Sequence, residues 1–307
     1  MDVRSTAKGP FLGSEALVAR AVSRRGLRRD HQQIYRDVYL PNGQSLTAAS
    51  RAEAAWLWSG RRGVVAGKSA AALLRSKWID AALPAELIRS SGKGVPGITI
   101  FRDELRATEV TAVRGIPVTT PARTAIDIGR RNTLLNAVIH LDALANATGL
   151  SVAQVDELAI VHRGARGLTR LRLAVQQMDG GAESPQETRT RLVLTDAGLP
   201  KPTTQVTVYD EGGYPFARID MAYEDCRVGI EYDGEQHWTD PKRRAHDIDK
   251  SVELTEHGWI IVRVSADMLR YRPWVIVARV VDALRATGCE WLVECPVKTR
   301  FPSENVS

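Results

Sequence analysis

Hydrophobic and polar residues alternate with a period of two through RIDMAYEDCRVGIEYD, residues 218 to 233. This alternation predicts a β-hairpin of two half-buried strands, with its turn at Asp225 and Cys226. Because side chains on a strand repeat every two residues, that turn fixes the register of the pairing. The apolar face then pairs Ile219 with Tyr232, Met221 with Ile230, and Tyr223 with Val228.

The opposite face of the hairpin carries carboxylates. Asp220 lies opposite Glu231, and Asp233 lies opposite Arg218. Directly opposed Cβ atoms are about 5 Å apart, and like charges at that separation destabilise a sheet unless something lies between them. A divalent cation satisfies this condition, because Mg²⁺ is held by carboxylate oxygens together with water and substrate phosphate. Mn²⁺ is the expected substitute.

Helical and strand patterns flank the hairpin. The stretch SPQETRTRLVLTDAGLP predicts a helix that begins after Ser184 as N-cap and ends before Gly198. Ser184 and Glu187 form a capping-box pattern, which gives Glu187 a structural role. The remaining expected elements are a strand at 204–209, a helix at 243–256, a strand at 259–264 and a helix at 273–287. This order predicts a mixed sheet flanked by helices, an α/β fold class that is α+β over the whole chain.

The N-terminal residues 12–41 predict two short helices and a strand hairpin, the element order of a small winged helix-turn-helix. Ser14 and Ser23 are the expected N-caps. Four arginines on the second helix share one face, which could meet DNA phosphates or simply be solvated. They are Arg24, Arg25, Arg28 and Arg29.

The middle of the chain is largely helical, with a hairpin expected at 86–105 and a linker at 179–182. The string GVVAGKS does not form a phosphate-binding loop, because three residues rather than four separate Gly63 from Gly67. The expected domains are a winged-helix-like head at 1–45, a middle region at 46–180, a C-terminal domain at 183–290 and a disordered tail at 291–307.

Composition adds three constraints. Residues 1–125 carry 20 Lys and Arg against 10 Asp and Glu, whereas the rest carries 22 against 26, so the N-terminal part favours a polyanion. No apolar stretch approaches about 20 residues, and no signal peptide is recognisable, so we expect no membrane partner and a cytoplasmic location. Three cysteines without CxxC spacing predict buried reduced thiols rather than disulfides or a zinc site.

The C-terminal strings SPQETRTRLVLTDAGLP, the hairpin with EYDGEQHW, and GWIIVRV resemble the PD-(D/E)xK nuclease superfamily, in particular domains similar to the very-short-patch mismatch-repair endonuclease. The resemblance covers residues 183–287. It implies that Asp220 and Glu231 bind Mg²⁺ and that Glu187 supplies a helix-borne acid.

The resemblance also places Asp233 where the family has a lysine. Asp233 is then either a further metal ligand, so that the ion itself activates water, or the partner of Arg218 in a structural ion pair. His237 is either a general acid, as its ordinary pKa allows, or a hydrogen-bonded loop residue. Arg263 could contact phosphate or pair with the acids.

The N-terminal strings FLGSEAL, YRDVYLP and TTPARTAIDIGRR, with the arginine helix, resemble AbiEi-type antitoxin and transcriptional-regulator proteins over residues 10–180. This resemblance implies a DNA-binding head and autoregulation. Three functions follow as hypotheses: a Mg²⁺-dependent endonuclease acting on DNA, a non-enzymatic regulator with a degenerate nuclease-like domain, and a module that pairs with a cognate toxin. A homodimer is a further possible assembly, since cutting both strands needs two active sites or two encounters.

Overall fold

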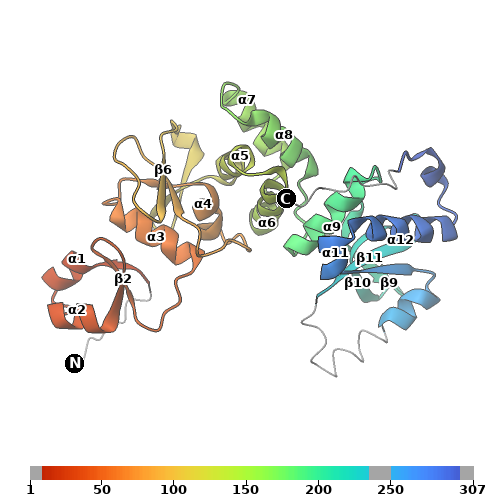
Figure 1. Ribbon diagram of the computed structural model, residues 1–307, viewed down its shortest axis with the longest axis horizontal. Coiled ribbons are helices and arrows are strands. Elements are labelled where there is room, and N and C mark those ends of the chain that lie inside the picture. The colour runs from red at the N-terminus through yellow and green to blue at the C-terminus, as the bar shows by residue number, and fades with distance from the viewer. Residues whose placement is uncertain (1–8, 235–249, 298–307) are drawn as a thin grey trace. The chain divides into compact units, whose positions relative to one another are not determined.

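The computed structural model describes residues 9–234 and 250–297. The chain divides into two compact units, residues 1–180 and 181–307 (Figure 1). Within the described residues, no helix is long and apolar enough to cross a membrane.

The first unit begins with the two short helices and the hairpin that the sequence predicts. Ser23 caps the second helix, because its hydroxyl accepts a hydrogen bond from the Gly26 amide at 3.0 Å. The expected Ser14 cap is wrong: the Ser14 amide and hydroxyl donate to the Asp37 carboxylate. The elements are β1 (Phe11–Leu12), α1 (Gly13–Val18), α2 (Arg24–Asp30), β2 (His31–Tyr35) and β3 (Val38–Pro41), with sheet order β1-β3-β2.

The hairpin packs on the region that follows it, since Tyr35 and Val38 belong to the same buried cluster as Leu57 and Leu87. That region contains a mixed sheet of order β6-β5-β4-β8-β7. Its elements are α3 (Ala48–Trp58), β4 (Val64–Val65), α4 (Gly67–Leu73), β5 (Ala85–Ile88), β6 (Ile98–Phe101), η1 (Ala107–Glu109), β7 (Val110–Val113) and β8 (Ile116–Thr119).

Two details of this region bear on the sequence predictions. The expected hairpin at 86–105 is wrong, because β5 and β6 pair in parallel and the intervening residues return the chain to the same end of the sheet. The N-terminus of α4, where a phosphate-binding loop would lie, is occupied by the carboxylate of Glu86, which accepts from the Lys68 amide. Four helices complete the unit: α5 (Pro121–Arg131), α6 (Leu134–Thr148), α7 (Val152–Val161) and α8 (Leu168–Gln177).

The second unit is a four-stranded mixed sheet of order β12-β11-β10-β9 with helices on both faces, which confirms the expected α/β layers (Figure 1). Leu194 of α9 and Val277 of α12 pack against one face, and Leu254 packs against the other. The elements are α9 (Pro185–Asp196), β9 (Thr203–Tyr209), β10 (Pro215–Tyr223), β11 (Val228–Asp233), helical residues 250–256, β12 (Ile260–Ser265), α11 (Ala266–Tyr271), α12 (Pro273–Ala286) and η3 (Glu290–Glu294).

The predicted hairpin is formed by β10 and β11, and the expected pairs of Met221 with Ile230 and of Tyr223 with Val228 are confirmed. The placement of Ile219 on the same face is wrong. Ile219 belongs to the cluster of Val206 and Leu254 on the opposite side of the sheet. Strand β10 therefore changes faces between Ile219 and Met221, where Gln205 on the paired strand β9 has a φ of +53°.

The prediction of reduced thiols is wrong for two of the three cysteines, because Cys226 and Cys289 form a disulfide with their Cα atoms 5.5 Å apart, whereas Cys295 is free. The hairpin turn and the end of α12 meet in one cluster, a proximity that a separation of 63 residues hides. Trp291, in the region expected to be a disordered tail, stacks on Tyr223 with ring centroids 5.3 Å apart. The rest of that tail, residues 298–307, lies outside the described residues.

Candidate functional site

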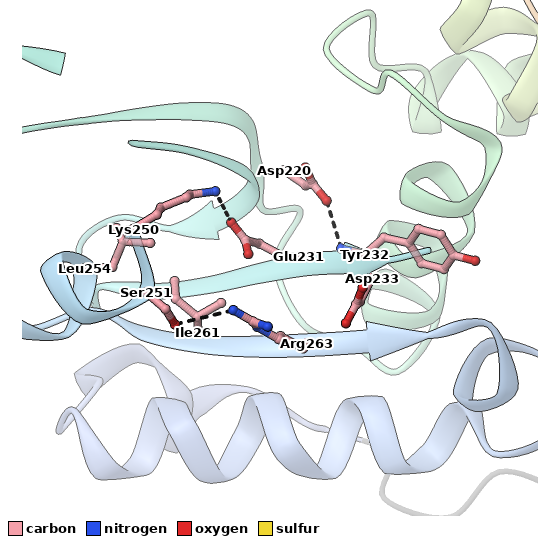
Figure 2. A pocket seen from close by; sticks show the side chains of 9 residues that line it. All are labelled: Asp220, Glu231, Tyr232, Asp233, Lys250, Ser251, Leu254, Ile261 and Arg263. Atoms are coloured by element: carbon pink, nitrogen blue, oxygen red, sulfur yellow. Dashed lines mark hydrogen bonds and ion pairs between the residues drawn. The ribbon is translucent and has the colours of Figure 1, made fainter. Parts of the chain in front are cut away.

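A pocket of about 180 Å³ opens in the second unit, beside β10, β11 and β12 and under helical residues 250–256 (Figure 2). The pocket lies at the point where β10 changes from one face of the sheet to the other. Its lining residues are Asp220, Glu231, Tyr232, Asp233, Lys250, Ser251, Leu254, Ile261 and Arg263.

Asp220 is a partly buried acid of this pocket. Its Oδ2 accepts a hydrogen bond from the Tyr232 amide at 2.8 Å (Figure 2). Burial first, and then the charges of Glu187 and Glu231, raise the pKa of Asp220 to about 6 against the opposing effects of the Tyr232 amide and Lys250. Burial in the pocket thus disfavours the charged form of this carboxyl, and the neighbouring acids add to the effect.

Lys250 supplies a positive charge that the sequence analysis did not anticipate. Its Nζ lies 2.6 Å from Oε1 of Glu231 and donates a second hydrogen bond to the Arg218 carbonyl at 2.8 Å (Figure 2). Both side chains of the pair are largely buried, at 22% and 20% exposure. Lys250 therefore brings a positive charge to this pocket from the helical residues 250–256 that follow β11. In the sequence, the only sign of this contact is that a lysine follows the hairpin, in the segment predicted to form the next helix.

Asp233 lines the pocket on the same strand as Glu231. The alternative of an Arg218–Asp233 ion pair is wrong, because both guanidinium nitrogens of Arg218 bind Glu183, at 3.1 and 2.9 Å. The carboxylate of Glu183 therefore accepts the hydrogen bonds of the Arg218 guanidinium. Asp233 consequently stays a predicted ligand, and its carboxylate has no partner among the described residues.

Glu187 on α9 is 7% exposed, and burial raises its pKa. Its Oε2 accepts from the Glu183 amide at 2.9 Å and from Nε2 of Gln205 at 3.0 Å. The Ser184 cap is confirmed by the bond from the Glu187 amide at 3.2 Å, but the return bond of the carboxylate goes to Glu183. Glu187 does not line the pocket, yet its charge reaches Asp220.

Two further residues were predicted to belong to the site, Arg263 and His237. Arg263 is exposed, pairs in register with Glu231, and lies 3.4 Å from the Ser251 hydroxyl through Nη2. It also lines the pocket. His237 lies outside the described residues.

The donor set of the pocket fits a hard cation of the Mg²⁺ class, which commonly takes one or two carboxylates and completes its shell with water and phosphate. Asp220 and Glu231 are the two carboxylates, and the supporting observation is that both line the same pocket. Over residues 9–234 and 250–297, no group of three or more His, Cys, Asp or Glu is arranged to hold a metal ion. A preformed cage of three carboxylates is therefore not found in this part of the chain.

The arginine face forms a second candidate site, in the first unit. Its four side chains are exposed and together line a surface hollow of about 560 Å³: Arg24, Arg25, Arg28 and Arg29. Arg29 forms an ion pair with Asp30 at 2.7 Å. The other three have no ion-pair partner in the described part of the chain, so their charges are available to a polyanion.

Comparison with known proteins bears on the first unit most directly. Residues 81–175 match the AbiEi antitoxin C-terminal domain family. This match supports the AbiEi-type resemblance of the N-terminal part and leaves the nuclease resemblance without such support.

Two curated relatives are similar to the chain, uncharacterised proteins of Mycobacterium tuberculosis from strains CDC 1551 / Oshkosh and ATCC 25618 / H37Rv. Each is 32% identical over 179 residues, which is 57% of this chain and 66% of the relative. The match thus spans just under two thirds of the relatives' length. No solved structure matches the chain.

Proposed function

We propose that this protein is a DNA-binding regulator of the AbiEi antitoxin type, which contacts DNA phosphates through the arginines of α2. The observation that carries the proposal is the surface hollow lined by four arginines on one short helix, next to a strand hairpin. Lys and Arg that neutralise phosphates release counterions and give affinity without reading sequence. The family match to residues 81–175 supports the regulator over a stand-alone enzyme.

The test is binding of a fluorescent duplex from upstream of the protein's own gene, measured at several salt concentrations. Changing Arg24, Arg25 and Arg28 to Gln should weaken binding and reduce the slope of log K against log salt by about 1 for each lost phosphate contact. The matched control changes three exposed arginines of the same unit to Gln: Arg163, Arg166 and Arg172. Equal losses in both triple variants would show that the α2 face is not the DNA-binding surface.

A second candidate function, hydrolysis of DNA phosphodiesters, is favoured by the Asp220, Glu231 and Lys250 constellation. Asp220 and Glu231 would hold Mg²⁺, which when bound lowers the pKa of water and neutralises developing charge on phosphate. Lys250 places a positive charge at the same pocket, and Arg263 offers a phosphate contact at its mouth. Lys250 and Arg263 would orient a phosphate and offset its negative charge.

Cleavage of supercoiled plasmid in Mg²⁺, Mn²⁺ or EDTA tests this candidate. We expect metal-dependent nicking that Glu231→Gln abolishes and that Glu224→Gln, an exposed acid in the same hairpin turn, leaves intact. If the wild-type protein binds DNA but does not nick it, the nuclease hypothesis is wrong and the regulator hypothesis stands. Copurification with a second protein or with a second copy would establish a toxin partner or a homodimer, both of which remain predictions.

A further inference from the structure

Residues 270–274, the aromatic corner, join the end of α11 to the start of α12 (Figure 1). Tyr271 is 58% exposed and Trp274 is 47% exposed. Their neighbours in the chain point inward, since Met268 and Ile276 are buried in the apolar cluster of the second unit. The core is therefore complete without the two rings. Two large aromatic side chains exposed within four residues are typical of a contact surface rather than of scattered apolar residues.

The aromatic corner is also strongly basic. Residues 268–281 carry three arginines and no acid: Arg270, Arg272 and Arg279. All three are exposed, and none has an ion-pair partner in the part of the chain that the structure describes. The surrounding sequence has the opposite balance, because residues 126–307 carry 22 Lys and Arg against 26 Asp and Glu. A local excess of positive charge on an acidic background favours contact with a polyanion at this place.

The rings and the arginines are interleaved. The guanidinium of Arg270 lies over the ring of Tyr271, with Cζ 5.1 Å from the ring centroid, and this cation–π contact presents a charge and an aromatic surface together. Arg272 lies between the two rings in the chain, at the C-cap of α11 and the N-cap of α12. Nucleobases stack on aromatic rings and on guanidinium planes, and arginine also binds the phosphates between them.

Tyr, Trp and Arg are frequent in protein interfaces as well. The charge distinguishes the two kinds of partner, because the core of a protein interface is depleted in charged residues. In the aromatic corner, unpaired arginines flank both rings, which fits a partner that carries negative charge along its whole length. The bases of that partner must be unpaired, since a duplex keeps base faces inside its own stack.

We propose that the aromatic corner binds single-stranded nucleic acid, with Tyr271 and Trp274 stacking on unpaired bases and Arg270 and Arg272 binding the adjacent phosphates. This site lies in the second unit and does not depend on the arginines of α2, which contact DNA phosphates in the proposed function. Phosphate contacts alone do not distinguish a single strand from a duplex. The two exposed rings supply that distinction.

The experiment measures binding of a fluorescent oligothymidine of about 12 nucleotides to the full chain by anisotropy. Tyr271→Ala and Trp274→Ala should each weaken binding about 5- to 150-fold, the range expected for loss of one base–aromatic stack. Phe at either position keeps a ring and should retain most of the affinity. The matched control is Tyr209→Ala with Tyr214→Ala, which removes two exposed rings of the same unit that lie beside acids rather than arginines.

Two further probes separate stacking from charge. An abasic oligomer of the same length has the same phosphates but no bases, so the wild-type chain should bind it more weakly than oligothymidine. The variant that lacks both rings should bind the two oligomers equally. Arg270→Gln with Arg272→Gln should reduce the slope of log K against log salt by about 1.4, since each phosphate contact on a single strand contributes about 0.7.

Measurements in the triple α2 variant keep this inference separate from the proposed function. There, duplex binding should be weakened while the loss caused by Tyr271→Ala or Trp274→Ala persists in full. An oligouridine of the same length distinguishes DNA from RNA. Binding of either strand supports the inference, and the tighter of the two identifies the natural source.

Four outcomes overturn the inference. They are no binding of either strand, equal wild-type affinity for the abasic oligomer and oligothymidine, equal losses in the Tyr209 and Tyr214 control, and unchanged strand affinity in the variant that lacks both rings. In the last case, sedimentation that shows a dimer lost in the same variant assigns the rings to a contact between two copies of the chain. Because the substituted side chains are exposed, the melting temperature should not change, and thermal unfolding checks this.

Discussion

His140 on α6 is a largely buried histidine whose Nδ1 has no hydrogen-bond partner in the described structure. Burial lowers its pKa to about 4, and the charge of Lys68 adds to the effect. The unfolded chain, with an ordinary histidine pKa near 6.5, therefore binds more protons than the folded chain between about pH 4 and 6.5. Stability should rise with pH across this window.

We expect the first unit to lose about 3 kcal/mol of stability on going from pH 7.5 to pH 4 through His140. His140→Gln should remove this part of the pH dependence, because the amide does not titrate. Urea unfolding at several pH values, with hydrogen exchange of α6 to localise the effect, measures it. An unchanged pH dependence in His140→Gln would assign the acid sensitivity to other groups.

Asp220 gives a prediction of opposite sign. Its pKa of about 6 lies above the ordinary aspartate value, so the folded chain binds more protons than the unfolded chain between about pH 4 and pH 6. Stability should therefore fall as the pH rises across this window and stay lower above it. In EDTA, Asp220→Asn should stabilise the second unit by up to about 3 kcal/mol at pH 8, since the amide oxygen can still accept from Tyr232.

That gain should shrink to a fraction of a kcal/mol near pH 4, where the folded carboxyl is protonated and the unfolded carboxyl is about half protonated. Denaturant unfolding at pH 4 and pH 8 is the measurement, and Glu224→Gln is the control. A destabilised Asp220→Asn at pH 8 would mean that the hydrogen bonds of the carboxylate outweigh its burial.

At the scale of an element, the N-cap of α2 stabilises the helix that carries the arginine face. The helix has only seven residues, so propensity alone does not hold it. The Ser23 hydroxyl fixes its first turn, and Leu27 anchors it in the interior. The arginines depend on this support for their shared face.

Ser23→Ala should destabilise the first unit by about 1 kcal/mol, the usual value of an N-cap. DNA affinity should fall as well, although no phosphate-binding residue has been changed. Thermal unfolding and duplex binding measure the two effects. Ser14→Ala is the comparison, because Ser14 binds Asp37 rather than capping its helix. A loss of stability with unchanged DNA affinity would separate the helix from the DNA-binding surface.

At the scale of the whole molecule, the chain forms two compact units, and the disulfide belongs to the second. It joins the β10–β11 turn to the end of α12 across 63 residues, so it restricts the unfolded state of that unit. The free Cys295 donates instead to the Gly198 carbonyl at 2.9 Å.

Cys226→Ser together with Cys289→Ser should therefore destabilise the second unit by about 2 to 4 kcal/mol and leave the first unit unchanged. Calorimetry with and without reductant should show one transition moving to lower temperature in the wild type and none moving in the double variant. Cys295→Ser is the control. Equal movement of both transitions would mean that the two units unfold together.

The sequence alone determined those features that depend on neighbouring residues. Alternation with a period of two determined the β10–β11 register near its turn, and local hydrogen bonds determined the caps at Ser23 and Ser184. The helical spacing of the arginines determined their shared face. Each of these follows from the geometry of one strand or one helix, which residue spacing encodes directly.

The tertiary structure decided what depends on contacts between distant segments. The pairing of Lys250 with Glu231, the bond from Gln205 to Glu187, the Cys226–Cys289 disulfide and the parallel pairing of β5 with β6 all join segments that no local pattern relates. Asp220 and Glu231 could be named from the sequence, but their partners could not. The physical reason is that a buried charge takes its partner from whichever chain segment packs beside it, and packing is a property of the whole fold.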